Sequence, residues 1–375
     1  MTHPASELHE WFATTEGRFE LSLSHSACQS LHVAELLDEA ELKAFGEVGL
    51  AYGAFEGLAE LRVSIADGYE TIDPSEVLTF NGPSEAIYTF MQAMLEPGDQ
   101  IVVPSPVFHP LHAIARQIGC EIKEWRATDE LSCTFDVDDL AAICDQSTKL
   151  IVINFPHNPS GQTVSESEFR RIFEIAECVD AVVFSDEAFR LLELPPHSTL
   201  PAACDLYNKA VSMTGMSKPF GLGGLRIGWL ATKSDDMRTA VRQYRYNTAE
   251  MTNTPCQWLA CRALQKSDEI LTRNRKTITA NLDRLAAFVE THNDTLSLFR
   301  PKAGTMALVK QDTKLTSTEF CERVLDEQRL FLIPGRPLGI SDRLLRFGLR
   351  MSDFSQGLER LGQFLTKLEE SDEAS

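Results

Sequence analysis

The sequence predicts an α/β protein that has a large domain with a mostly parallel central sheet and a smaller α+β domain. From about residue 45 to 245, short apolar runs alternate with amphipathic windows, the pattern of a parallel sheet covered by helices. After about residue 250 two long helical patterns are followed by isolated strand patterns. We therefore expect an N-terminal arm with part of the small domain at 1–44, the large cofactor-binding domain at 45–245, and an interdomain helix with the small domain at 246–375.

The expected elements follow from these apolar patterns. In the large domain the strand-like runs are Gln100–Pro104, Leu150–Phe155, Ala181–Ser185, Lys209–Thr214 and Gly228–Thr232. The helical windows are Ser84–Leu95, Leu111–Ile118 and Glu166–Cys178, then longer patterns at Asp235–Leu264 and Glu269–Thr291. The small domain is expected to hold strands at Thr305–Lys310 and Leu344–Leu349 and helices at Ser317–Glu327 and Ser355–Lys367.

The composition disfavours several classes of function. A formal net charge of −20 makes nucleic acid an unfavourable partner and a cationic small molecule a favourable one, although the charge also serves solubility. No apolar run approaches the roughly 20 residues that a membrane span needs, so we expect no membrane partner. The nine cysteines show no CxxC pair and no spacing typical of metal ligands. We therefore expect free thiols in a reducing cytoplasm and no metal site.

The stretch SMTGMSKPFGLGGLRIGWL, residues 212–230, places Lys218 among small residues between two strand-like runs. Desolvation in such a crowded place lowers the pKa of a lysine, which favours a nucleophile or a Schiff-base former. Arg226 follows eight positions later and offers a planar guanidinium for a phosphate. The simpler interpretation is an ordinary loop lysine, so other stretches must decide between the two.

Three further stretches lie where predicted elements meet. NGPSEA (81–86) is a helix start whose free amides suit an anion. NFPHNPSG (154–161) follows a strand and presents Asn158 at its carboxyl end, where open α/β sheets bind ligands. FSDEAF (184–189) ends a strand with Asp186, and a buried carboxylate needs a cationic partner. The first two can also be explained as an ordinary helix start and a plain turn.

LLRFGLR (344–350) places Arg346 inside an apolar strand. A buried guanidinium is costly without an anion, so Arg346 either binds a ligand carboxylate or forms an internal ion pair. Together, a phosphate cradle, an orienting asparagine, a buried aspartate, a hidden lysine and a buried arginine describe a site for pyridoxal 5'-phosphate (PLP) bound as a Schiff base.

Over roughly residues 45–350 the chain resembles the fold-type I PLP enzymes of the aspartate aminotransferase superfamily, class I/II. GMSKPFGLGGLRIG is similar to the lysine signature of that family along its whole length. The resemblance implies that Lys218 carries PLP, that Asp186 pairs with the pyridinium nitrogen and that Asn158 bonds the ring hydroxyl. It also implies that Phe108, in SPVFHPL, stacks on the ring.

The same resemblance implies the remaining ligands. The PLP phosphate would be held by the amides of Ser84 and Glu85 and by Arg226. Arg346 would take the α-carboxylate of a small amino acid substrate. Tyr52, in AYGAFEGLAELR, matches a tyrosine that reaches the phosphate of the partner subunit, which implies a homodimer.

Two positions depart from the aminotransferase pattern. Phe189 stands where those enzymes usually have a tyrosine bonded to the ring hydroxyl. Gly215 stands where a hydroxyl residue is expected, so one phosphate contact is lost, and Ser217 or Thr214 is the candidate to replace it.

NFPHNPSG, DEAF and LFLIPGRPLGISDRLLRFG are more similar to capreomycidine synthase-like enzymes and to the guanitoxin-pathway cyclodehydratase that forms L-enduracididine. This resemblance implies a PLP-dependent lyase or cyclase that removes water from a hydroxylated L-arginine, such as 4-hydroxy-L-arginine, and closes a guanidine ring. The other interpretation is an aminotransferase that tolerates Phe189. The sequence leaves open whether Cβ or Cγ carries the hydroxyl.

The N-terminal arm offers residues for such a substrate. Glu7 and Glu10 can pair with a guanidinium. His9 and His25 can act as acid or base near neutral pH, and we expect His25 to be catalytic. The alternative is that all four are solvated surface residues.

Overall fold

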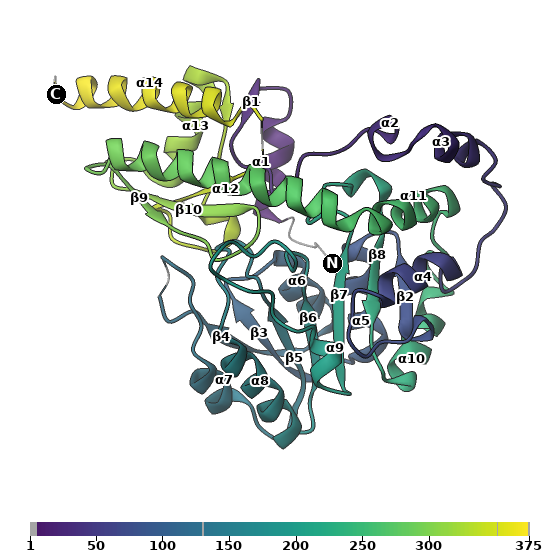
Figure 1. The fold of residues 1–375 in the computed structure, drawn as a ribbon. Helices are drawn as coiled ribbons and strands as arrows, with labels where there is room; N and C mark the ends of the chain where they lie inside the picture. The colour runs from purple at the N-terminus through teal and green to yellow at the C-terminus, as the bar shows by residue number, and fades with distance from the viewer. Residues whose placement is uncertain (1–5, 130, 351, 374–375) are drawn as a thin grey trace.

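The computed structural model describes residues 6–129, 131–350 and 352–373. A large α/β domain carries a smaller α+β domain on one side, and the long helices α12 (Ser267–Thr291) and α14 (Phe354–Glu373) run across the top (Figure 1). The predicted fold class is confirmed. In the described part of the chain no helix is long and apolar enough to cross a membrane.

The central sheet has seven strands in the order β2-β8-β7-β6-β5-β3-β4. Strand β8 is antiparallel to both of its neighbours, and the other adjacent pairs are parallel. In sheet order the strands are Val77–Phe80, Gly228–Ala231, Ala210–Gly215, Val182–Asp186, Thr148–Asn154, Gln100–Ser105 and Glu121–Arg126. The sequence analysis missed β2 and β4. Strand β4 reads EIKEWR and lies at the sheet edge, where polar side chains interrupt the apolar run.

Helices cover both faces of this sheet, because successive strand residues point to opposite sides. On β3, Ile101 and Val103 join one core with α5 (Pro83–Met94), α6 (His109–Ile118) and α10 (Asp235–Arg245), while Val102 joins the other core with α7 (Val137–Ile143) and α8 (Glu166–Cys178). The continuous apolar strand patterns follow from burial on both faces.

The structure has two helices where the sequence predicted one long helix over Asp235–Leu264, so that prediction was wrong. Helix α10 ends at Arg245 and α11 (Thr254–Gln265) begins after an eight-residue connection. Asn253 caps α11 by accepting a hydrogen bond from the Cys256 amide at 3.0 Å. Pro255 follows in the first turn, where its missing amide costs nothing. The cap signal NTP was present in the sequence.

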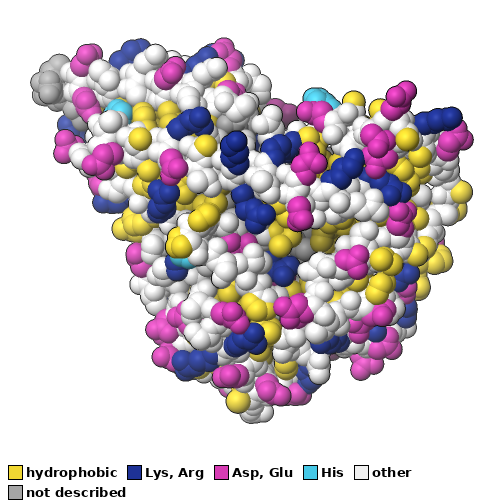
Figure 2. Space-filling model, in the orientation of Figure 1, with side chains coloured by type: hydrophobic (Ala, Val, Ile, Leu, Met, Phe, Trp, Pro, Cys, Tyr) yellow, Lys and Arg dark blue, Asp and Glu magenta, His cyan; other side chains and the backbone are white. Residues whose placement is uncertain are grey.

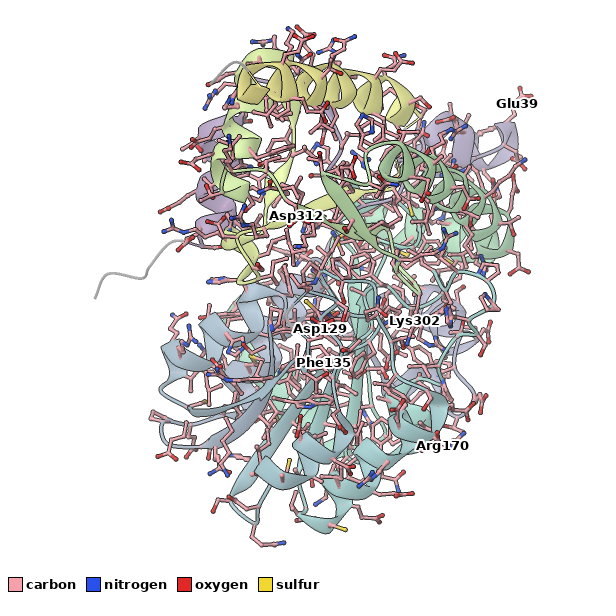
Figure 3. All side chains as sticks on the ribbon, turned by 90° about the vertical axis from the view of Figure 1, so that its left-hand side faces the viewer. Glu39, Asp129, Phe135, Arg170, Lys302 and Asp312 are labelled. Carbon is pink, nitrogen blue, oxygen red and sulfur yellow. The ribbon has the colours of Figure 1, made fainter. Side chains whose placement is uncertain are left out.

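The small domain is built on a four-stranded antiparallel sheet in the order β12-β13-β10-β9. The strands are Ile333–Pro334, Leu344–Gly348, Met306–Gln311 and Leu296–Phe299. Helices α13 (Ser317–Gln328) and α14 pack together beside the sheet. Figure 3 shows Asp312 in this upper domain and Arg170 near the far end of the large one.

The N-terminal segment joins the small domain before the chain enters the large one. Strand β1 (Leu21–Ser22) pairs in parallel with β11 (Leu330–Phe331), and Trp11 in α1 (Glu7–Thr15) donates to the Leu332 carbonyl at 3.0 Å. The chain then leaves the body through α2 (Val33–Leu36) and α3 (Glu39–Gly46) and returns at α4 (Ala59–Ala66) (Figure 1). On the face in Figure 2, acidic and basic side chains are interspersed, with apolar patches between them.

The remaining short elements complete the chain. They are helix α9 and the 3₁₀ turns η1, η2 and η3, at Ala203–Leu206, Pro74–Glu76, Gly223–Leu225 and Arg336–Leu338.

Candidate active site

A cavity of about 580 Å³ lies at the carboxyl ends of the central strands, under parts of the small domain. Strand ends supply Asn154 from β5 and Asp186 from β6, and Lys218 follows β7. Helix α1, η3 and strand β13 supply the opposite walls. Open α/β sheets bind their ligands at this edge, because loops there bring side chains from distant parts of the chain together.

Lys218 reaches this cavity from the loop after β7. Its ε-amine donates a hydrogen bond to the Ser26 hydroxyl at 2.7 Å and lies 5.7 Å from the centre of the Phe189 ring. Burial, followed by the charge of Arg346, lowers the pKa of Lys218 to about 8, although the Asp186 carboxylate opposes the shift. About one tenth of the lysine is therefore neutral and nucleophilic at pH 7, far more than for a lysine of ordinary pKa.

Asp186 is the buried carboxylate expected at the end of β6. Its side chain accepts a hydrogen bond from the Ala188 amide at 3.0 Å. Burial raises the pKa of Asp186 to about 7, although that hydrogen bond and the charge of Lys218 act in the opposite direction. A carboxylate in this environment gains from a nearby cation such as a protonated pyridine ring.

Asn154 was missed by the sequence analysis and joins the two central strand ends. Its amide nitrogen donates to the Asp186 carbonyl at 3.0 Å, and its Oδ1 accepts from the Asn158 backbone amide at 2.9 Å. Asn158 also lines the cavity. The Asn154 side chain thus fixes the loop that carries Asn158 relative to Asp186, and its place as the last residue of a buried strand was the available signal.

A phosphate cradle forms where α5 begins. Gly82 caps the helix at φ +100°, and a Cβ there would lie 2.2 Å from Nη2 of Arg226. The Arg226 guanidinium donates to the Gly223 and Asn81 carbonyls at 3.2 and 3.4 Å, and no ion pair of Arg226 is found among the described residues. Ser84 and Ser217 line the same part of the cavity. Free first-turn amides beside an arginine suit a phosphate.

The Glu85 side chain points away from the cavity, towards Asn81 and Arg245. The carboxylate accepts from the Asn81 amide at 2.5 Å and lies 3.9 Å from Arg245. Glu85 is not among the cavity-lining residues, so only its backbone amide remains a candidate phosphate ligand.

Arg346 crosses from β13 into the cavity and is 4% exposed. Its Nη2 donates to the Ser24 carbonyl at 3.1 Å, whereas Nε is buried without a partner in the described structure. Burial lowers the pKa of Arg346 to about 10, so the group stays cationic at neutral pH. A partly unsatisfied buried cation beside Lys218 is suited to a carboxylate.

The four residues expected from the N-terminal arm do not meet in one place. His9 lines the cavity together with its helix neighbours Leu8 and Phe12. Glu7 is exposed and lies 3.5 Å from Arg336, and Glu10 is exposed as well. Neither glutamate lines the cavity.

His25 likewise does not line the cavity. Its ring packs against Phe331 and Phe19, with ring centres 5.9 and 6.3 Å away. Burial and the nearby cations lower the pKa of His25 to about 4, so it is neutral near pH 7. This placement argues against direct contact with a substrate.

The structure adds cavity residues that the sequence analysis did not single out. His109 and His112 are separated by three positions on α6, and Glu124 on β4 lines the same cavity. His112 Nε2 lies 2.9 Å from the Pro104 carbonyl, so Nδ1 is its free acceptor, and Nδ1 is buried without a partner in the described residues. The spacing HPLH after Phe108, itself a cavity residue, was the available signal.

This arrangement fits PLP by its own chemistry. The cavity offers a lysine of lowered pKa, a buried carboxylate to which no cation of the described residues is bonded, an asparagine beside them and an arginine at a helix start. Fold and site together define a PLP enzyme of fold type I.

The chain belongs to the aminotransferase class I and II family, whose sequence profile matches residues 21–358. It is 28% identical to capreomycidine synthase of Streptomyces vinaceus, over 96% of this chain and 94% of that one. It is 26% identical to aspartate aminotransferase of Pyrococcus abyssi, over 90% and 87%.

Solved structures agree with the fold. A PLP-dependent aminotransferase from Streptococcus suis superposes with a TM-score of 0.92 at 27% identity, covering 98% of this chain and 99% of that one. The PLP-dependent cyclase OrfR superposes with a TM-score of 0.89 at 28% identity, covering 98% of each.

Proposed function

We propose that this enzyme is a PLP-dependent cyclodehydratase that acts on a hydroxylated L-arginine, with 4-hydroxy-L-arginine as the expected substrate and L-enduracididine as the expected product. The observation that carries the proposal is the full-length similarity to capreomycidine synthase and to the PLP-dependent cyclase OrfR, each at 28% identity. Phe189 supports it, because the ring that faces Lys218 offers no hydroxyl.

Each of three cavity residues has a separate role in this reaction. Bound PLP supplies the electron sink that makes the substrate Cα–H bond acidic, and Asp186 keeps the ring nitrogen protonated. Arg346 binds the α-carboxylate and so fixes the Cα–H bond for removal. Lys218 takes the Cα proton, as its lowered pKa allows.

The remaining steps form the ring. For a hydroxyl on Cγ, a Cβ proton is removed and the hydroxyl takes up a proton and leaves as water. A guanidine nitrogen then bonds to Cγ and loses its own proton, and protons return to Cβ and Cα. The amino group stays on Cα, so the substrate loses one water and keeps every nitrogen. A hydroxyl on Cβ would instead give a six-membered ring.

The outer part of the cavity is where we place the side chain of the substrate. Glu124 lines the cavity together with His9, His109 and His112, and its carboxylate lies 3.0 Å from Arg126 and 3.9 Å from Arg116. Burial lowers the pKa of both His109 and His112, so these rings are neutral at pH 7 and can accept a proton. We therefore assign the guanidinium contact to Glu124 in preference to Glu7 and Glu10, and the ring-closure base to His9 or its neighbours in preference to His25.

We propose a homodimer as the active unit. Tyr52 is 90% exposed, and Leu50, two positions before it, is 87% exposed, on the segment between α3 and α4. Two large exposed apolar side chains in one segment are typical of an interface. Tyr52 is too exposed to serve the cavity of its own subunit, which suits a contact with the partner's phosphate site.

The decisive experiment incubates the pure PLP-loaded enzyme with 3-hydroxy- or 4-hydroxy-L-arginine, without any 2-oxo acid, and determines the product mass. A product lighter by one water with all nitrogens retained supports the proposal. An absolute requirement for a 2-oxo acid acceptor would show instead an aminotransferase. That second function is favoured by the close superposition on the Streptococcus suis aminotransferase.

A further inference from the structure

The residue that holds the Lys218 amine comes from the N-terminal segment, 192 positions away in the sequence. The ε-amine donates to the Ser26 hydroxyl at 2.7 Å. Ser26 lines the same cavity as Lys218 and is half-buried there. Phe189, on another side of the amine, presents only the face or edge of an apolar ring. The bond to Ser26 therefore fixes where the nitrogen lies.

The Ser26 hydroxyl is held in place by a rigid backbone. The Thr305 hydroxyl donates to the Ser26 carbonyl at 2.6 Å, and the Cys28 amide donates to the Lys218 carbonyl at 3.4 Å. The segment also presses against β13, where a Cβ on Gly348 would lie 2.0 Å from the His25 carbonyl oxygen. Contacts on both sides thus prevent Ser26 from following the amine if it moves.

We propose that Ser26 is a positioning residue for Lys218, which keeps the amine lone pair directed at the substrate carbon during proton transfer. A neutral amine that donates one N–H to a fixed hydroxyl has its lone pair oriented. The ammonium formed after proton uptake donates to the same oxygen, so the bond persists through the step. The role applies to any Cα proton transfer by Lys218, whether the overall reaction is cyclisation or transamination.

The surroundings of Lys218 predict how loss of this bond changes its titration. Arg346 and Arg350 disfavour the ammonium, whereas Asp186 and Cys28, when ionised, favour it. The Ser26 oxygen adds a hydrogen bond that is stronger to the charged form. Ser26→Ala removes that contribution and leaves the four charged or ionisable neighbours in place, so the pKa of Lys218 is expected to fall further below its usual range.

The first test uses the apoprotein and needs no substrate. The rate of Lys218 acetylation by acetic anhydride is followed against pH, with peptide mass spectrometry as the readout. We expect the pKa of Lys218 to fall by about one unit in Ser26→Ala and to stay near that of the native protein in Ser26→Thr, which keeps the hydroxyl. Ser30→Ala removes an exposed hydroxyl from the same segment and is the matched control.

The second test uses the PLP-loaded enzyme and measures exchange of the Cα hydrogen of L-arginine in D₂O. We expect exchange in Ser26→Ala to slow by roughly 100-fold at saturation, since small misplacement of a reacting group has costs of that size, with half-saturation by L-arginine changed less than about twofold. An unchanged Lys218 pKa in folded Ser26→Ala apoprotein, or failure of Ser26→Thr to restore it, would overturn the proposal. That outcome is independent of whether the enzyme makes a cyclic product.

Discussion

The ε-amine of Lys218 lies 5.7 Å from the centre of the Phe189 ring, which is 1% exposed. An aromatic ring without a hydroxyl therefore forms this wall, at the position where the resemblance to aminotransferases implies a tyrosine. The ring leaves the amine without a polar partner on that side, and this bears directly on which reaction the site favours.

We expect Phe189→Tyr to shift the enzyme towards transamination, because the added hydroxyl can hydrogen-bond at the cofactor ring as the family tyrosine does. The ratio of 2-oxo acid to cyclic product should rise about tenfold, because one hydrogen bond contributes a free energy of about that size. Chromatography of the products measures the ratio. Phe55→Tyr, at a half-exposed ring elsewhere, is the control, and an unchanged ratio in Phe189→Tyr would contradict this role.

Arg346→Lys keeps the positive charge but loses the planar fork that binds a carboxylate with two hydrogen bonds. We expect KM to rise roughly 10- to 100-fold, with PLP affinity changed much less. Steady-state kinetics and a PLP titration measure the two. Equal losses of both affinities would indicate a structural role for the arginine instead.

Stability of the apoprotein should report the raised pKa of Asp186. The folded state holds that proton up to about pH 7, whereas the ordinary pKa is 3.8. The native protein therefore has this stabilising contribution at low pH and loses it as pH rises from about 4 to 7. Asp186→Asn has no such proton and does not lose this contribution. We therefore expect the melting temperature of the variant, relative to that of the native apoprotein, to increase as the pH rises from about 4 to 7.

The same variant, Asp186→Asn, should have low activity when it is loaded with PLP. The amide that replaces the carboxylate in Asp186→Asn is neutral and could not stabilise a protonated ring nitrogen, so we expect activity to fall at least about 100-fold. Thermal melts of the apoprotein across pH measure the effect on stability, and assays with added PLP measure the effect on activity. A parallel pH dependence of the two melting temperatures would contradict the assigned titration.

Tyr52→Phe tests the shared site of the proposed homodimer. Loss of one hydroxyl contact to phosphate should weaken PLP binding about tenfold and leave the dimer intact. Equilibrium dialysis for PLP and light scattering for mass provide the measurements. Full activity of a monomer in dilute solution would refute the shared site.

His9→Ala and His25→Ala separate the two histidines of the N-terminal arm. His9 lines the cavity and His25 packs on Phe331 and Phe19, so we expect ring formation to slow more in His9→Ala, by about 10- to 100-fold. PLP absorbance should be retained in both variants. A larger effect of His25→Ala would restore the role expected for it from the sequence.

The sequence by itself determined the family, and it predicted the cavity residues that follow strand ends. Lys218, Asp186 and Asn158 were found because each lies at or just after the end of a buried strand, and parallel strands all end at one edge. Strands β3, β5, β6 and β7 were found within two residues of their bounds at either end, because burial on both faces makes their patterns continuous.

Only the tertiary structure decided what lies opposite those residues. Ser26 accepts a hydrogen bond from Lys218, and Glu124 and His112 line one cavity, although no local sequence pattern connects these segments. The same packing turns His25 onto Phe331 and leaves Glu7 at the surface, although all arm residues looked alike as polar side chains. Periodicity predicts which face of an element is buried, but the partner across a cavity depends on how the two domains pack together.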